Sequence, residues 1–188
     1  MRRKIPVTIF LGLWLSLSIF SLEEKKGPEE YQLKAIFIAN IAAFIQWPKN
    51  SSMVDRSQPV VFGIIGETPP LRTWGEKIYH QEKSKIKGKE VKIVDIISLE
   101  EISDCNFLFI SRSVAEDLPK ILEITKNKPI LTIADTEGFT KKGVHINLLR
   151  IRGSVKYEIN QMALKRSSLV PKYQLLKYAS RVFGEETR

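Results

Sequence analysis

The chain has 188 residues, 43% of them hydrophobic and 27% charged, which is the usual balance of a globular domain with a short N-terminal extension. The formal net charge is +9, but the lysines are scattered and their one cluster, Lys83 to Lys92, contains no aromatic residue, so the composition argues against nucleic-acid binding. The single cysteine, Cys105, excludes an intramolecular disulfide, and no set of Cys and His residues has the spacing of a zinc site.

The N-terminal residues have the pattern of a secretory signal peptide. A basic start, Arg2 to Lys4, precedes an apolar run from Ile5 to Phe20, and small serines stand ahead of the charged residues that follow. The run has 16 residues, fewer than the roughly 20 that a bilayer span needs. We therefore expect residues 1–21 to direct export to the periplasm. An uncleaved anchor is the open alternative, because no A-x-A cleavage site is present.

A second apolar stretch, from Ala35 to Ile45, is also too short to span a membrane, since it has only 11 residues. Pro28 suits the start of a helix around this stretch, and Trp47 ahead of Pro48 suits its end. Apolar residues cover almost every face of this helix, as in helices that are packed on several sides. The stretch is predicted to be the deeply buried first helix of an exported domain.

Beyond Gln58 the sequence alternates short β-branched runs with amphipathic ones, a pattern typical of strands that alternate with helices. Helices are expected after Pro69 and Pro70, and after a capping box at Ser113 to Glu116. This order predicts an α/β fold of three layers, with a mostly parallel sheet flanked by helices. The expected strands are PVVFGIIG (59–66), EVKIVDII (90–97), CNFLFIS (105–111) and KPILTIAD (128–135).

The segment from Gly143 to Asn160 predicts two antiparallel strands, which form a hairpin at one edge of the sheet. An exposed edge strand can pair with a partner protein or with a second copy of the chain. The sequence leaves open the alternative that its charges only protect the edge from aggregation. The charged residues on the side expected to be exposed, and therefore the candidate partner-binding residues, are Arg150, Arg152, Lys156 and Glu158.

The end of the chain is predicted to be helical. Asn160 suits an N-cap, and a last helix is expected from about Pro171 through Phe183, where Gly184 ends it. No internal repeat or linker interrupts the chain, so residues 28–184 are expected to form a single domain.

Six segments in register resemble the YfiR-like family of exported bacterial proteins, and the resemblance runs from Tyr31 to Ala179. They are YQLKAIFIANIAAFIQWP, VVFGIIG, CNFLFIS, PILTIADTEGF, GVHINLLRIRGSVKYEIN and LLKYA. The resemblance implies a regulator without enzymatic activity that binds the periplasmic sensory domain of an inner-membrane signalling protein. In the best understood member of the family this partner is a diguanylate cyclase, which is held inactive, and other members serve different membrane sensors.

Two departures from the family pattern affect what the resemblance implies. Before the final LL, where relatives usually have small residues, this chain has Pro171, Lys172 and Tyr173. Lys172 and Tyr173 are therefore candidate partner-binding residues, and a partner contact at this point is expected to differ from that of the relatives. Some relatives carry paired cysteines, whereas Cys105 stands alone here and cannot serve in a disulfide.

The alternative function is a periplasmic small-molecule-binding protein with a pocket at the carboxyl ends of the strands, where ligands bind in open α/β sheets. Its candidate residues are Gly66, Ser111 and Asp135. Turn and capping roles also account for residues of these types, and no serine lies in a nucleophile-elbow sequence, so a hydrolase is a weaker hypothesis. No catalytic residue, metal ligand or cofactor is predicted.

Overall fold

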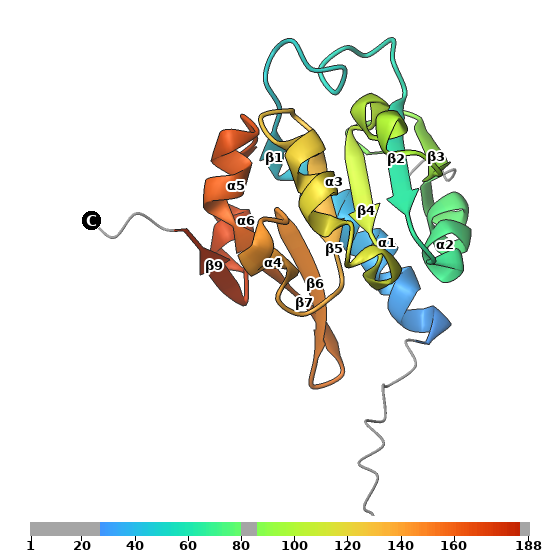
Figure 1. Cartoon of the computed structure of the whole chain (residues 1–188), viewed down its shortest axis with the longest axis vertical. Coiled ribbons are helices and arrows are strands. Elements are labelled where there is room, and N and C mark those ends of the chain that lie inside the picture. Colours follow the sequence, from blue (N-terminus) through green and yellow to red (C-terminus); the bar gives the residue numbers. More distant parts are fainter. Residues whose placement is uncertain (1–26, 80–85, 185–188) are drawn as a thin grey trace, which may run out of the picture.

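The computed structural model describes residues 27–79 and 86–184 (Figure 1), so the predicted signal peptide at 1–21 lies outside the described residues. Within them the strands form a seven-stranded sheet of order β3-β2-β4-β5-β6-β7-β9. The first five strands of this order are mutually parallel, β7 is antiparallel to β6, and β9 is parallel to β7. The strands are β2 (Val60–Ile65), β3 (Val91–Ile96), β4 (Phe107–Ile110), β5 (Leu131–Ala134), β6 (Ile146–Ile151), β7 (Ser154–Asn160) and β9 (Arg181–Phe183).

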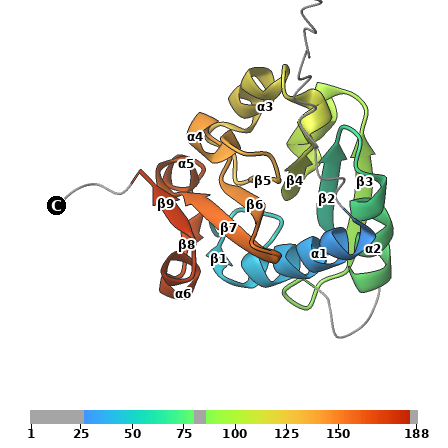
Figure 2. The same ribbon diagram turned by 90° about the horizontal axis from the view of Figure 1, so that it is seen from below.

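Helices cover both faces of the sheet and so confirm the predicted three-layer α/β fold (Figure 2). The long helices α1 (Pro28–Ala43) and α2 (Pro69–Tyr79) lie on one face. The other face carries α3 (Leu118–Thr125) and α4 (Phe139–Lys142), with α5 (Gln161–Arg166) beyond them. The remaining helical elements are η2 (Leu99–Asp104), η3 (Arg112–Val114) and α6 (Tyr173–Lys177).

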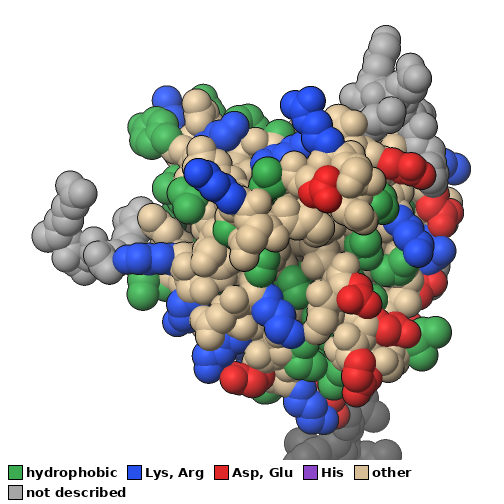
Figure 3. Space-filling model, turned by 90° about the horizontal axis from the view of Figure 1, so that it is seen from above, with side chains coloured by type: hydrophobic (Ala, Val, Ile, Leu, Met, Phe, Trp, Pro, Cys, Tyr) green, Lys and Arg blue, Asp and Glu red, His purple; other side chains and the backbone are tan. Residues whose placement is uncertain are grey.

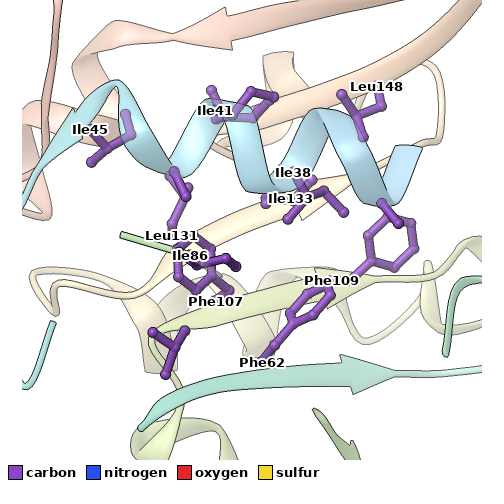
Figure 4. Packing of buried hydrophobic residues seen from close by; sticks show 14 of the residues in the cluster. Ile38, Ile41, Ile45, Phe62, Ile86, Phe107, Phe109, Leu131, Ile133 and Leu148 are labelled. Carbon is purple, nitrogen blue, oxygen red and sulfur yellow. The ribbon is translucent and has the colours of Figure 1, made fainter. Parts of the chain in front are cut away.

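The larger hydrophobic core lies between α1, α2 and the sheet. Ile38 of α1 is fully buried, and Figure 4 shows α1 crossing above the strands that carry Phe62, Phe107 and Phe109. Phe62 and Phe107 meet edge to face, with their ring centroids 6.3 Å apart, an arrangement that aromatic pairs prefer. Each buried phenylalanine stabilises the fold by about 1.5–3 kcal/mol relative to an exposed one. The predicted helix is therefore confirmed and its inner side is buried, but Leu33 and Ile36 are exposed, so the helix is not covered on every side as the sequence predicted.

The first helix ends at Ala43, earlier than the predicted end at Trp47. The chain leaves the helix because β1 (Ile45–Gln46) pairs with β8 (Val170–Pro171) in a separate two-stranded sheet. Trp47 itself is buried in the core. No helix in the described part of the chain is long and apolar enough to cross a membrane.

The predicted capping box at Ser113 to Glu116 is wrong. The Ser113 hydroxyl accepts a hydrogen bond from the backbone N–H of Glu67, 2.8 Å away in a distant part of the chain. Ser111 caps η3 instead, and α3 begins only after Asp117. The capping-box pattern did not predict the structure here, because the Ser113 hydroxyl binds the segment that follows β2 instead of capping its own helix.

The predicted last helix is correct only in its first part. It ends at Lys177, and Val182 and Phe183 belong to β9, which pairs with Glu158 to Asn160 of β7. The Ser180 backbone N–H and hydroxyl both donate to the Tyr157 carbonyl and so direct the chain onto the sheet. The antiparallel hairpin is confirmed, with one further strand outside it.

Candidate functional site

A buried row of alternating charges crosses the domain from the end of β5 to the hairpin. The Lys34 ammonium lies 2.7 Å from the Asp135 carboxylate and 2.5 Å from the Glu30 carboxylate, and only 1% of the Lys34 side chain is exposed. The second Glu30 oxygen lies 3.5 Å from the guanidinium of Arg150, which is partly exposed. The row therefore ties α1 to the carboxyl end of β5 and to the hairpin.

Tyr31 completes this charged row. The Lys34 ammonium lies 4.7 Å from the centre of the Tyr31 ring. Burial, and then the negative charges of Asp135 and Glu30, raise the pKa of the Tyr31 phenol well above its usual range, so the phenol stays protonated and can donate to Asp135. The sequence interpretation missed Lys34, although it is the one charged residue between Tyr31 and Ile45 and a buried lysine requires a carboxylate partner.

The predicted strand-end pocket is brought together only in part. The Ser111 hydroxyl donates to the Glu67 carbonyl at 3.1 Å, directly beside Gly66, whereas the Asp135 carboxylate is paired with Lys34. These serine bonds lie between the carboxyl ends of β2 and β4, where the connections of the parallel sheet change direction and a ligand crevice would open. A pocket there stays a prediction.

Replacing Gly66 with alanine is expected to lower the free energy of unfolding by about 1–3 kcal/mol. Gly66 has a φ of +88°, and an added Cβ would lie 2.5 Å from the Ser113 hydroxyl oxygen. Urea unfolding measures the loss. Gly88→Ala is the matched control, since φ is +75° there and nothing lies within 4 Å of the added atom. Equal losses in the two variants would contradict a role for the strand-end contacts.

The hairpin of β6 and β7 projects from the body of the domain (Figure 1) and carries Arg152 and Lys156 on its exposed surface. Glu158, which was expected to be exposed beside them, is buried. Its carboxylate accepts from the Thr140 hydroxyl at 3.3 Å and lies 3.8 Å from the guanidinium of Arg181. The prediction that Glu158 is exposed is wrong, because β9 pairs with this part of β7 and covers it.

The other two candidate residues lie at the opposite end of α1 from the hairpin. The backbone N–H of Lys172 donates to the Phe44 carbonyl at 2.8 Å, and the Lys172 ammonium lies 6.0 Å from the centre of the Phe44 ring. Tyr173 is exposed beside it. The sequence candidates therefore divide into two groups, one near each end of α1.

Three exposed apolar side chains, two on α1 and one at the residue that caps its end, lie between these two groups. They are 46% exposed at Leu33, 39% at Ile36 and 37% at Phe44, and their spacing places them on the same side, with the exposed Asn40 between the last two. We name these three residues the α1 surface. At its hairpin end, Leu33, Arg150 and Val155 help to line a hollow of about 370 Å³. The sequence interpretation missed this surface, because apolar residues on all sides of a helix do not show which side is left uncovered.

The described residues offer little for catalysis or metal binding. Burial raises the pKa of the Cys105 thiol to about 11, so this thiol is not a ready nucleophile. Within the described residues, 27–79 and 86–184, no group of three or more His, Cys, Asp or Glu side chains is close enough together to hold a metal ion. His80 lies outside the described residues, and His145 is buried.

The sequence matches the YfiR/HmsC-like family over residues 31–180, which covers most of the described fold, including α1, the hairpin and α6. The chain belongs to this YfiR/HmsC-like family. Membership supports a role as a periplasmic regulator, as the resemblance implied. Among curated proteins, no sequence matches the chain.

Solved structures show only a distant likeness to this YfiR/HmsC-like protein. One is the ABC domain in complex with L-Trp from Streptococcus pneumonia, at 14% identity and a TM-score of 0.48, over 66% of this chain and 56% of that one. Another is a conserved domain protein from Vibrio cholerae, at 9% identity and a TM-score of 0.49, over 81% of this chain and 60% of that one. The chain thus spans less than two thirds of either structure.

Proposed function

We propose that this protein is a non-enzymatic periplasmic regulator that binds and represses the periplasmic sensory domain of an inner-membrane diguanylate cyclase. The observation that carries the proposal is the family match over residues 31–180. The apolar N-terminal run from Ile5 to Phe20 suits export into the compartment in which that sensory domain lies.

The α1 surface is the part of the structure that fits a protein partner best. Exposed apolar side chains on one side of a helix are a common feature of interaction sites. Leu33, Ile36 and Phe44 lie on one side of the α1 segment, whose other side is packed against the sheet, so their positions are set before a partner binds. A rigid patch loses little conformational freedom on association, which favours tight binding.

Basic residues flank the patch at both ends and define the chemistry of the partner. Arg150, Arg152 and Lys156 lie at the hairpin end, and Lys172 lies beside Phe44 at the other end. We infer that the matching surface of the sensory domain has an apolar centre and an acidic rim. Charges of this kind at a rim act mainly on the rate of association and on specificity, while the apolar centre supplies most of the affinity.

Affinity capture from membranes of the native host tests the partner and the surface together. The tagged protein is expected to recover an inner-membrane protein with a cytoplasmic cyclase domain. Ile36→Asp is expected to weaken capture at least about tenfold, because it places a charge at the centre of the interface. Ile97→Asp is the matched control, since Ile97 is 91% exposed and directly follows β3, the edge strand at the other end of the sheet from the hairpin strands.

Cyclic-di-GMP levels in a deletion strain complete the test. Loss of the protein is expected to raise the level, which the wild-type chain and Ile97→Asp restore and Ile36→Asp does not. An unchanged level in the deletion strain would contradict the cyclase link. Full restoration by Ile36→Asp would instead reject the α1 surface and leave the partner in place.

A further inference from the structure

The helices α3, α4 and α5 lie on the other side of the sheet from α1 (Figure 2). Residues of these three helices and of the segments that follow them line a pocket of about 360 Å³, within the usual size range of small-ligand sites. Its lining includes the cations Lys126, Lys142 and Arg166 and a single carboxylate, that of Glu123. The charged lining is therefore positive by two.

The cations of this pocket have an ordinary explanation only in part. Each lies at the carboxyl end of a helix, where a positive charge interacts favourably with the exposed carbonyl groups. Lys126 is also paired with Glu123 at 3.2 Å. Within the described part of the chain, however, neither Lys142 nor Arg166 has a carboxylate partner, and helix ends alone do not explain why both cations line one cavity.

The pocket also reaches a buried hydrogen-bond donor. The backbone N–H of Thr132 donates to His145 Nδ1 at 3.0 Å, so the proton of the neutral ring is on Nε2, which lies 3.1 Å from the Ser167 hydroxyl oxygen. The Nε2 proton has two acceptors, the Ser167 hydroxyl and the Ala163 carbonyl, and in either case the Ser167 proton cannot go to the ring and is left to donate. Because Ser167 lines the pocket and is only 3% exposed, this donor is available to a group bound in the pocket and is largely shielded from bulk water.

We propose that this pocket binds the phosphate group of inorganic phosphate or of a small phosphate monoester. A guanidinium and an ammonium match the two negative charges of phosphate, and Arg166 can present two N–H donors to it. The Ser167 hydroxyl supplies a third, neutral donor. A carboxylate ligand would leave one of the two excess positive charges of the lining unmatched.

The wider charge distribution supports an anionic ligand on this side. Residues 120–184 contain thirteen Lys and Arg against four Asp and Glu, a formal charge of +9. Figure 3 shows Lys and Arg side chains mainly over the half of one face from which the C-terminus emerges, while Asp and Glu lie mainly over the other half. Such a field raises the local concentration of anions near the pocket.

Thermal unfolding of the purified protein tests the site, with inorganic phosphate titrated at an ionic strength held constant by chloride. A saturable rise in Tm is expected. Arg166→Gln and Lys142→Gln are each expected to weaken phosphate binding about tenfold, since each removes a charge-assisted hydrogen bond. Lys141→Gln removes the same charge from an adjacent residue that does not line the pocket, and is expected to bind as the wild type does.

Three outcomes would overturn the proposal: no saturable response to phosphate, equal weakening by Lys141→Gln, or full binding by Arg166→Gln. Glycerol 3-phosphate and vesicles that contain phosphatidic acid, whose head group is also a phosphate monoester, then separate the sources of the phosphate. Binding to the soluble ester supports a free metabolite, and binding only to vesicles supports a lipid head group. Because Arg166 and Lys142 are exposed and distant from the α1 surface, capture of the membrane partner by these variants separates a failure here from a failure of the proposed function.

Discussion

Lys34→Met is expected to lower the free energy of unfolding by about 3–5 kcal/mol, measured by urea unfolding at neutral pH. The Lys34 side chain lies between two buried carboxylates, at 2.5 Å from Glu30 and 2.7 Å from Asp135. Methionine fills a similar volume, so the loss comes from charge rather than from a cavity. Without the ammonium, the two buried carboxylates lose the cation that lies between them.

Two further variants separate this explanation from a general effect of replacing a lysine. Lys120→Met breaks an exposed ion pair with Asp117 and is expected to change stability by at most about 1 kcal/mol. Lys34→Met combined with Asp135→Asn is expected to recover part of the loss, because one buried charge is then removed with its partner. A loss as small as that of Lys120→Met would show that the buried row of charges is not a stabilising feature.

The central parallel strands were predictable because they are buried on both faces of the sheet. A strand buried on both faces is a continuous apolar run, and the Phe107–Ile110 segment is such a run with every residue buried. The strands that escaped prediction, β1, β8 and β9, have two or three residues each. They form through pairing with distant segments, and in the case of Val182 and Phe183 their side chains also fit a helical pattern.

The candidate sites were less predictable because they depend on contacts across long stretches of sequence. Asp135 follows a strand as a turn residue would, and its partner Lys34 lies 101 residues away. Ser113 begins a convincing capping box, yet it binds a backbone group 46 residues away. The residue types were recognised in both cases, but their partners were not. The family resemblance indicated the class of function only because six segments were read together.

Lowering the pH from 7 to 4 is expected to destabilise the protein through His145, by on the order of 3 kcal/mol. Burial, and then the positive charge of Arg166, lower the pKa of His145 to about 4, from an ordinary value near 6.5. Above pH 6.5 the imidazole is neutral in both the folded and the unfolded chain, so it has no effect on stability. Between pH 6.5 and 4 only the unfolded chain takes up the proton, so folding becomes less favourable as the pH falls.

Urea unfolding of the wild type and of His145→Asn across this pH range measures the effect. Asparagine retains an acceptor for the Thr132 N–H but does not titrate, so the variant is expected to be less stable at pH 7 and to lose less stability on acidification. His80 and every carboxylate are common to both proteins, so the difference between the two pH profiles isolates His145. Parallel profiles would mean that the ring has the same pKa in the folded and the unfolded chain, which would contradict a folded state that holds His145 neutral down to about pH 4.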